Sequence, residues 1–221
     1  MSRAVAEINI NAIKSNLNLI NNKTKSQILV VVKANAYGHG LIPVAKAVVE
    51  SGADWLGTAL LEEAIELRNS GISTPIIAWL TPPGEDFRSA LELNIDLSIS
   101  SLEVLDEIVL ASKLVNKVPR LHIEIDTGMS RGGVRDDWEK LFIQLEELVK
   151  SNKINVVGIW THFARADEPE EQMNATQLSQ LTDRALELEK RGIKPEFIHI
   201  ANSAAALTNK QSHKSIVRWG I

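Results

Sequence analysis

Two periods of apolar residues alternate along this chain. Short continuous apolar runs, such as Ile28–Val32, are typical of parallel strands that are buried on both faces. Between these runs, apolar residues recur three or four positions apart, which is typical of helices that bury one face. The apolar runs predict eight strands, at 28–34, 55–60, 75–80, 96–100, 121–127, 156–163, 197–201 and 215–219.

Helical periodicity fills the intervals between the predicted strands. It predicts seven helices, at 41–51, 61–69, 85–93, 101–115, 136–151, 171–191 and 203–210. At the start of the fourth of these helices we expect a capping box formed by Ser100 and Glu103.

The first residues add one more strand and one more helix. Residues 3–10 alternate between apolar and polar side chains and predict a half-buried strand. Asn11 is then a candidate cap for a helix at 11–21, in which Ile13, Leu17 and Ile20 lie on one face.

Strands that alternate with helices favour a parallel sheet covered by helices. The number of strands predicts a (β/α)8 barrel of the TIM type, and an open doubly wound sheet is the alternative. In the barrel, the helix at 11–21 takes the eighth outer position, because no helix follows the strand at 215–219. Residues 1–221 then form a single domain, and the strand at 3–10 needs a partner that the chain does not contain.

Polar side chains end or follow several predicted strands, at the end where such barrels carry their functional sites. They are Lys33, Arg131, His162, Asn202, Ser203 and Arg218. Structural explanations exist for some of them: a lysine can extend its amine from a strand mouth to water, and a buried histidine can be hydrogen-bonded within a core. Ser203 could cap the helix that begins at Ala204, and such a helix start also binds phosphate through its free amides. A barrel would bring all of these side chains to one rim.

Five separated segments of the chain are similar to segments of one known family. VVKANAYGHG (31–40), DTGMSR (126–131), THFA (161–164), ANSA (201–204) and VRWGI (217–221) occur in this order. In these segments the chain resembles the alanine racemase family, whose barrel domain binds pyridoxal 5′-phosphate (PLP). The resemblance implies a homodimeric enzyme that interconverts L- and D-alanine and supplies D-alanine for peptidoglycan. Serine stays open as an alternative substrate.

The resemblance implies a role for each residue of the expected site. Lys33 would carry PLP as a Schiff base and act as one of two catalytic bases. Five residues would surround the cofactor phosphate: Tyr37, Asn202, Ser203, Gly220 and Ile221. Arg218 would contact the pyridine nitrogen, with His162 behind it, and Arg131 would contact the phenolic oxygen.

An arginine at the pyridine nitrogen fits racemisation. Its guanidinium does not readily give up a proton, so the ring nitrogen stays unprotonated. Negative charge on the substrate Cα is then not drawn fully into the ring, and this limits the competing transamination.

Glu124 is a departure from the family pattern. Many family members have a lysine at this position, often carbamylated, and its negative charge positions the neighbouring arginine. Because Glu124 and Asp126 lie on the same face of a strand, we expect Glu124 to supply this charge to Arg131 without modification.

The second catalytic base of the family is a further departure. In the family it is a tyrosine of a C-terminal β-domain, contributed across the dimer interface. The only tyrosine in this sequence is Tyr37, and the sequence stops within the last matching segment. We therefore expect the barrel half of a racemase, which binds PLP and racemises poorly by itself.

Composition narrows the remaining possibilities. A formal net charge of −4 argues against nucleic acid or an anionic membrane as a partner, and the absence of cysteine excludes disulfides, thiolate catalysis and cysteine-based metal sites. The start of the chain lacks the apolar core of a signal peptide, so we expect a cytoplasmic protein. We expect no metal in the site. Two alternative functions stay open: a single-domain PLP carrier without catalysis, and an aldolase that uses Lys33 to form an imine with a phosphorylated substrate.

Overall fold

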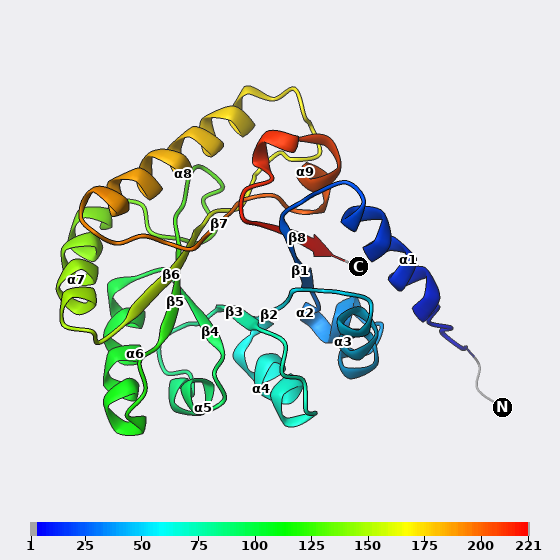
Figure 1. The fold of residues 1–221 in the computed structure, drawn as a ribbon, viewed down its shortest axis with the longest axis horizontal. Helices are drawn as coiled ribbons and strands as arrows, with labels where there is room; N and C mark the ends of the chain where they lie inside the picture. Colours follow the sequence, from blue (N-terminus) through cyan, green and yellow to red (C-terminus); the bar gives the residue numbers. More distant parts are fainter. Residues whose placement is uncertain (1–3, 221) are drawn as a thin grey trace.

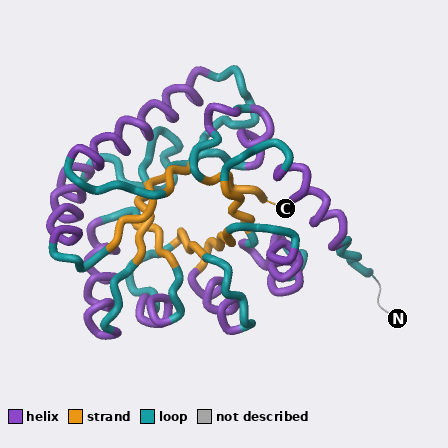
Figure 2. Tube along the Cα trace, viewed as in Figure 1, coloured by secondary structure: helices purple, strands orange, loops and turns teal. Residues whose placement is uncertain are grey.

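Eight parallel strands pair in sequence order and close into a barrel in the structure, a computed structural model that describes residues 4–220. The strands are β1 (Gln27–Val31), β2 (Trp55–Leu60), β3 (Ile76–Leu80), β4 (Asp96–Ile99), β5 (Arg120–Glu124), β6 (Asn155–Trp160), β7 (Phe197–His199) and β8 (Ile216–Gly220). β8 pairs with β1 along its whole length and completes the ring, which Figure 2 shows from one end. The predicted TIM-type barrel is confirmed, and the open sheet is wrong.

The helices surround this ring (Figure 1). They are α1 (Ile10–Asn21), α2 (Lys33–Tyr37), α3 (Leu41–Glu50), α4 (Leu61–Asn69), α5 (Phe87–Glu92), α6 (Leu102–Val115), α7 (Trp138–Lys150), α8 (Gln172–Lys190), α9 (Ser203–Thr208) and the 3-10 turn η1 (Lys210–Ser212). α1 packs against α3, on the side of the ring where β1 and β8 meet, and buries Ile13, Leu17 and Ile20. It takes the outer position that the sequence predicted for it.

Two apolar layers hold the fold together. Side chains alternate along each strand, so Ile28 and Val30 of β1 pack against the helices while Leu29 and Val31 point into the barrel. Gly57 makes room inside the barrel, because a Cβ there would lie 2.5 Å from Leu29 Cδ2. The interior is thus a packed core beneath the rim.

Three predicted strands extended three residues too far at their carboxyl ends. The strands predicted at 28–34, 121–127 and 156–163 end at Val31, Glu124 and Trp160. The apolar pattern continues beyond these points because Val32, Ile125 and Phe163 are still buried in the outer apolar layer. The misassigned residues are therefore those that form the rim.

The strand predicted at 3–10 is wrong for the residues that the structure describes. Residues 4–9 form no strand, and they lead away from the body of the molecule (Figure 1), with Val5 78% exposed. A strand needs a neighbour for its backbone groups, and a closed barrel offers no free edge.

Two helix caps differ from the predicted residues. Asn9, not Asn11, caps α1, because its Oδ1 accepts from the Ala12 amide at 3.0 Å. Ser101, not Ser100, caps α6 through the Val104 amide at 3.2 Å. In both cases the cap has a non-helical backbone, and its side chain reaches the amide three positions later. The spacing of apolar residues does not show which residue has this backbone conformation.

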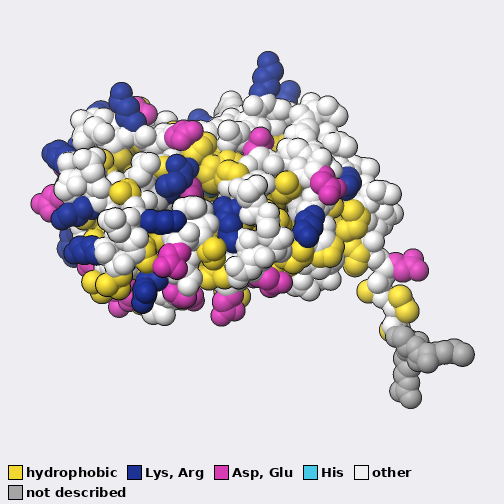
Figure 3. Space-filling model, turned by 60° about the horizontal axis from the view of Figure 1, so that its bottom comes forward, with side chains coloured by type: hydrophobic (Ala, Val, Ile, Leu, Met, Phe, Trp, Pro, Cys, Tyr) yellow, Lys and Arg dark blue, Asp and Glu magenta, His cyan; other side chains and the backbone are white. Residues whose placement is uncertain are grey.

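The surface carries both signs of charge. Figure 3 shows Lys and Arg side chains interspersed with Asp and Glu over the face in view, with no large area of a single sign. Among residues 4–220, no helix is long and apolar enough to cross a membrane.

Candidate functional site

A cavity at the carboxyl ends of the strands gathers most of the predicted site residues. The predicted residues that line it are Lys33, Tyr37, Arg131, His162, Asn202, Ser203, Arg218 and Gly220, and Ile221 lies outside the described residues. A wider cavity, of about 560 Å³ against about 100 Å³, lies between residues 125–135 and α8. None of the predicted site residues lines this wider cavity, so the chemistry of the lining, not the volume, identifies the site.

Lys33 follows β1 and begins a short left-handed turn. The next four residues, Ala34–Tyr37, have φ values between 52° and 55°. For residues other than glycine this conformation costs about 1–2 kcal/mol each. Asn35 secures the turn: its amide donates to Glu63 Oε1 (3.2 Å), and its Oδ1 accepts from the Leu41 amide (2.7 Å). Strain of this kind is found at functional sites, where the surrounding structure enforces it.

The turn brings Lys33 and Tyr37 to the same cavity. The Nζ of Lys33 lies 5.9 Å from the centre of the Tyr37 ring. Within residues 4–220, this amine forms no hydrogen bond and no ion pair. It is therefore available for chemistry with a ligand.

Arg218, on β8, is held by four hydrogen bonds. Its acceptors are the carbonyl oxygens of Thr161 (3.0 Å) and Ile200 (3.1 Å), His162 Nδ1 (3.2 Å) and His199 Nδ1 (3.2 Å). Burial lowers the pKa of Arg218 to about 10, with Glu124 opposing the change, so the side chain is still charged at neutral pH. Its Nε–H and one of the two N–H groups at Nη1 have no acceptor among the described residues. These donors are free for a ligand.

His162 lies just after β6 and forms a hydrogen bond with Arg218. Its Nδ1 accepts from Arg218, so the ring proton is on Nε2. Burial, and then the positive charges of Arg218, Arg131 and Lys33, lower the pKa of His162 to about 3. The ring is therefore neutral at physiological pH.

The start of α9 lies beside the end of β8. Asn202 caps α9, because its Oδ1 accepts from the Ala205 amide at 3.1 Å, so the prediction that Ser203 is the cap is wrong. Ser203 Oγ instead accepts from the Gly220 amide at 2.8 Å, and the Ser203 amide has no acceptor within residues 4–220. A Cβ at Gly220 would lie 3.0 Å from Tyr37 Oη, so glycine keeps a space open beside these groups.

Glu124 ends β5 and lies among the charges of the site. Burial raises its pKa to about 7, although Arg218 and Arg131 act in the opposite direction. Its carboxyl group is therefore partly protonated near neutral pH, and within the described residues it forms no hydrogen bond or ion pair with Arg131. The structure therefore does not favour a permanent negative charge on Glu124. That Glu124 positions the exposed Arg131 stays a prediction.

Sequence reasoning missed three polar residues inside the barrel. Asp96, His122 and His199 are at most 5% exposed, and they come from three different strands. The available signal was a polar residue at an inward position of an apolar run. Gly158 was a second signal, because a Cβ there would collide with the His122 ring, and glycine within a strand indicates close approach.

Comparison with known sequences identifies the family. Residues 8–221 match the family described as alanine racemase, N-terminal domain. The alanine racemase of Thermobifida fusca is 40% identical over 222 residues, which cover 100% of this chain and 59% of that protein. The alanine racemase of Salinispora arenicola is 38% identical over 222 residues, covering 100% of this chain and 60% of that protein. The chain thus spans about 60% of the length of these curated relatives.

Solved structures agree with the sequence match. The alanine racemase of the D-cycloserine-producing Streptomyces lavendulae superposes with a TM-score of 0.94 at 40% identity, over 96% of this chain and 56% of that chain. That of Clostridium difficile 630 gives a TM-score of 0.91 at 33% identity, over 100% of this chain and 59% of that chain. By sequence and by fold, this chain belongs to the family of alanine racemase N-terminal domains.

Proposed function

We propose that this chain is the PLP-binding barrel of an enzyme that racemises alanine. The observation that supports this most directly is the meeting of Lys33, which follows β1, and Arg218, from β8, at one cavity. Each carries N–H groups that no described residue accepts. An unpaired amine and a fixed guanidinium on opposite ends of the chain are what a cofactor with an aldehyde and a ring nitrogen requires.

The residues of the cavity fit the parts of PLP. Lys33 would take the aldehyde carbon and Arg218 the pyridine nitrogen. The free Ser203 amide, Tyr37 and the space at Gly220 would take the phosphate, and Arg131 the phenolic oxygen. When bound, PLP supplies an electron sink for negative charge on the Cα of an amino acid.

The protein's own residues determine which reaction follows. Arg218 has only donors and stays charged, so it can hold the ring nitrogen without protonating it. Lys33 would move a proton at the substrate Cα on one face. Neither of these groups needs a metal.

We propose that the second proton-transfer group comes from outside this barrel, from a C-terminal domain that the partner subunit contributes in a homodimer of the full-length enzyme. Burial raises the pKa of Tyr37, so its hydroxyl stays protonated, and His162 has a pKa near 3 and is a weak base. Neither can readily take a proton at neutral pH. Alanine is the substrate that fits the names of the relatives.

The experiment that tests the cofactor assignment is reductive trapping. The protein is incubated with PLP, reduced with borohydride and digested, and the labelled peptide is identified by mass spectrometry. The label is expected on Lys33, and Lys33→Ala should give a colourless protein with no label. Lys46→Ala, at an exposed position of α3, is the matched control and should keep both. A label on Lys46 or any other lysine contradicts the site.

A second experiment separates catalysis from simple cofactor carriage. Each alanine enantiomer is incubated with the PLP-loaded chain in deuterated water, and both label uptake and chirality are followed. Exchange from one enantiomer with little racemisation is expected. Covalent PLP without any exchange would favour the non-catalytic carrier, and full racemisation would show that the second group lies within this barrel.

A further inference from the structure

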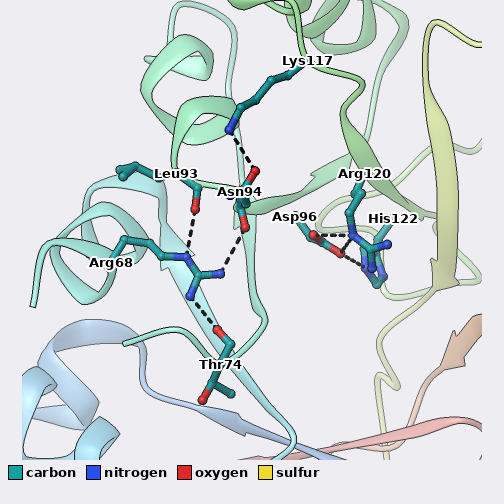
Figure 4. A network of polar contacts seen from close by, with 8 residues as sticks. All are labelled: Arg68, Thr74, Leu93, Asn94, Asp96, Lys117, Arg120 and His122. Carbon is teal, nitrogen blue, oxygen red and sulfur yellow. Dashed lines mark hydrogen bonds and ion pairs between the residues drawn. The ribbon is translucent and has the colours of Figure 1, made fainter. Parts of the chain in front are cut away.

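A chain of hydrogen bonds runs through the barrel interior to Arg218. It starts at Asp96, the first residue of β4, and passes through two histidines. The contacts are Asp96 Oδ2 to His122 Nε2 (3.3 Å), His122 Nδ1 to His199 Nε2 (3.1 Å) and His199 Nδ1 to Arg218 Nη1 (3.2 Å). Asp96 also accepts from Arg120 Nε at the start of β5, and Figure 4 shows its carboxylate facing both Arg120 and His122. The chain therefore connects the amino end of the barrel with the rim.

Only one arrangement of protons satisfies every contact of this chain. Arg218 has only donors, so His199 must accept at Nδ1 and carry its proton on Nε2. That proton is donated to His122 Nδ1, so His122 carries its own proton on Nε2. The last donor meets Asp96, a carboxylate that only accepts. A donor-only group at one end and an acceptor-only group at the other thus fix both tautomers.

We propose that Asp96 and His122 are positioning residues that hold His199 in the tautomer that accepts from Arg218, and so set Arg218 toward the cofactor. The step from Arg218 to the cofactor rests on the proposed function. The assignment of the two tautomers is independent of it.

The packing of the two rings supports a fixed arrangement. His199 is stacked on Trp160 with a centroid distance of 5.7 Å, and His122 is stacked on Phe197 at 6.1 Å. The His122 ring lies directly against Gly158, where a Cβ would collide with it. Burial lowers the pKa of His199 well below its usual value, so this ring is neutral. Turning either ring over would take its nitrogens away from their partners, so the position of the protons must satisfy the contacts.

An Asp96→Asn substitution should move the ring protons of both histidines to their other nitrogens. Arg120 requires an acceptor, so it selects the amide oxygen and leaves the amide NH2 facing His122 Nε2. Under the proposal, His122 then accepts at Nε2 and carries its proton on Nδ1, and the unsatisfied contact moves to the Arg218 end. His199 follows in the same way, and its Nδ1–H then faces an N–H of Arg218. That hydrogen bond is lost.

The test is ¹⁵N NMR of the histidine rings in the PLP-free protein. In the wild type, the ring protons of His122 and His199 are expected on Nε2. His39, whose Nδ1 contacts the Ala36 carbonyl (2.8 Å), and His213, whose Nε2 contacts the Ala206 carbonyl (2.8 Å), are internal references for the two tautomers. A wild-type His199 with its proton on Nδ1 would overturn the proposal without any variant.

Two variants sharpen the measurement. Asp96→Asn should move both protons to Nδ1 and leave the two references unchanged. Arg120→Gln is the matched control, because it removes the ion pair and keeps the carboxylate, so the wild-type tautomers should persist. Unchanged tautomers in folded Asp96→Asn protein would overturn the proposal.

The effect of Arg218 on the cofactor is tested separately, by measuring the affinity for PLP. Asp96→Asn should weaken PLP binding about tenfold, the effect of losing one hydrogen bond to a charged group. If the tautomers reverse and PLP affinity is unchanged, the positioning of Arg218 toward the cofactor is wrong. If the wild type binds no PLP at Lys33, the proposed function fails, and the tautomers still decide the role of Asp96 and His122.

Discussion

Two arginines show how the two ends of the barrel differ. Arg68 lies at the end of α4, at the amino end of the barrel, and Arg218 lies below the rim. Each makes four hydrogen bonds, and burial lowers the pKa of both. The acceptors of Arg68 are all loop carbonyls, of Ile72 (2.9 Å), Thr74 (2.6 Å), Leu93 (3.0 Å) and Asn94 (3.1 Å), three of which Figure 4 shows. Arg218 instead shares its donors with two histidines and keeps some of them free.

The backbone differs between the two ends in the same way. After α5, α6 and α7, at the amino end, a positive φ falls on Asn94, Asn116 and Asn152. Asparagine tolerates this conformation, so the turns carry little strain. At the rim, Ala34 and Tyr37 adopt it instead. The amino end is built for stability, whereas the rim keeps strain and unpaired donors for a ligand.

The largest expected effect comes from breaking the amino end. Arg68→Ala leaves four loop carbonyls without their donor and should lower the free energy of unfolding by about 3–4 kcal/mol. Urea unfolding would measure it. PLP attachment to Lys33 in the folded variant should be unchanged, and a parallel loss of PLP binding would contradict the separation of the two ends.

At the rim, the carboxyl group of Glu124 should make the stability of the folded protein depend on pH. Because the folded-state pKa of Glu124 is raised from 4.5 to about 7, the folded protein binds more protons than the unfolded chain between these values. Stability contributed by this group is therefore present at low pH and is lost as pH rises from 5 to 8. Allowing for partial exposure, the loss should be about 2 kcal/mol.

Comparing Glu124→Gln with the wild type isolates the loss of stability that is due to ionisation of Glu124. The variant should lose the extra fall in stability between pH 5 and pH 8. Glu146→Gln is the control. The hydrogen bond from Lys150 lowers the pKa of Glu146, so this variant should show the same fall in stability between pH 5 and pH 8 as the wild type. Equal pH profiles for Glu124→Gln and the wild type would show that Glu124 is ionised throughout.

The smallest expected effect comes from relieving strain at the rim. Ala34→Gly removes the steric cost of the left-handed conformation and should raise the free energy of unfolding by up to about 1 kcal/mol, after the greater freedom of the unfolded chain is subtracted. Ala175→Gly, at an exposed position of α8, should lower it by about 1 kcal/mol. Thermal unfolding of both variants gives the comparison, and the same sign for both would mean that the turn is not strained.

The sequence allowed the barrel to be predicted because each strand and helix has its own period. Lys33 and Arg218 were found because parallel strands bring their carboxyl ends together, and the resemblance supplied their roles. Asp96, His122 and His199 were not found, because nothing in the sequence pairs a polar residue of one strand with a polar residue of another. Their meaning depends on contacts between strands far apart in the sequence.

The left-handed turn was also beyond sequence reasoning. Alanine and tyrosine do not favour a positive φ. The turn is held by hydrogen bonds from the Asn35 backbone amide to Glu63 and from the Leu41 amide to Asn35 Oδ1, which the sequence does not reveal. Tertiary contacts override local preference there, as is expected at a functional site.

The way in which the ring closes has a consequence for synthesis of the protein. β8 pairs with β1 at five positions, from Gln27 with Ile216 to Val31 with Gly220, but with β7 at only one. On the ribosome, the first strand must therefore wait with an open edge until almost all of the domain has been translated. Arg218 arrives on that last strand, so the nascent chain cannot complete early the cavity that Lys33 and Arg218 line. Folding and completion of this cavity should occur together, late in translation.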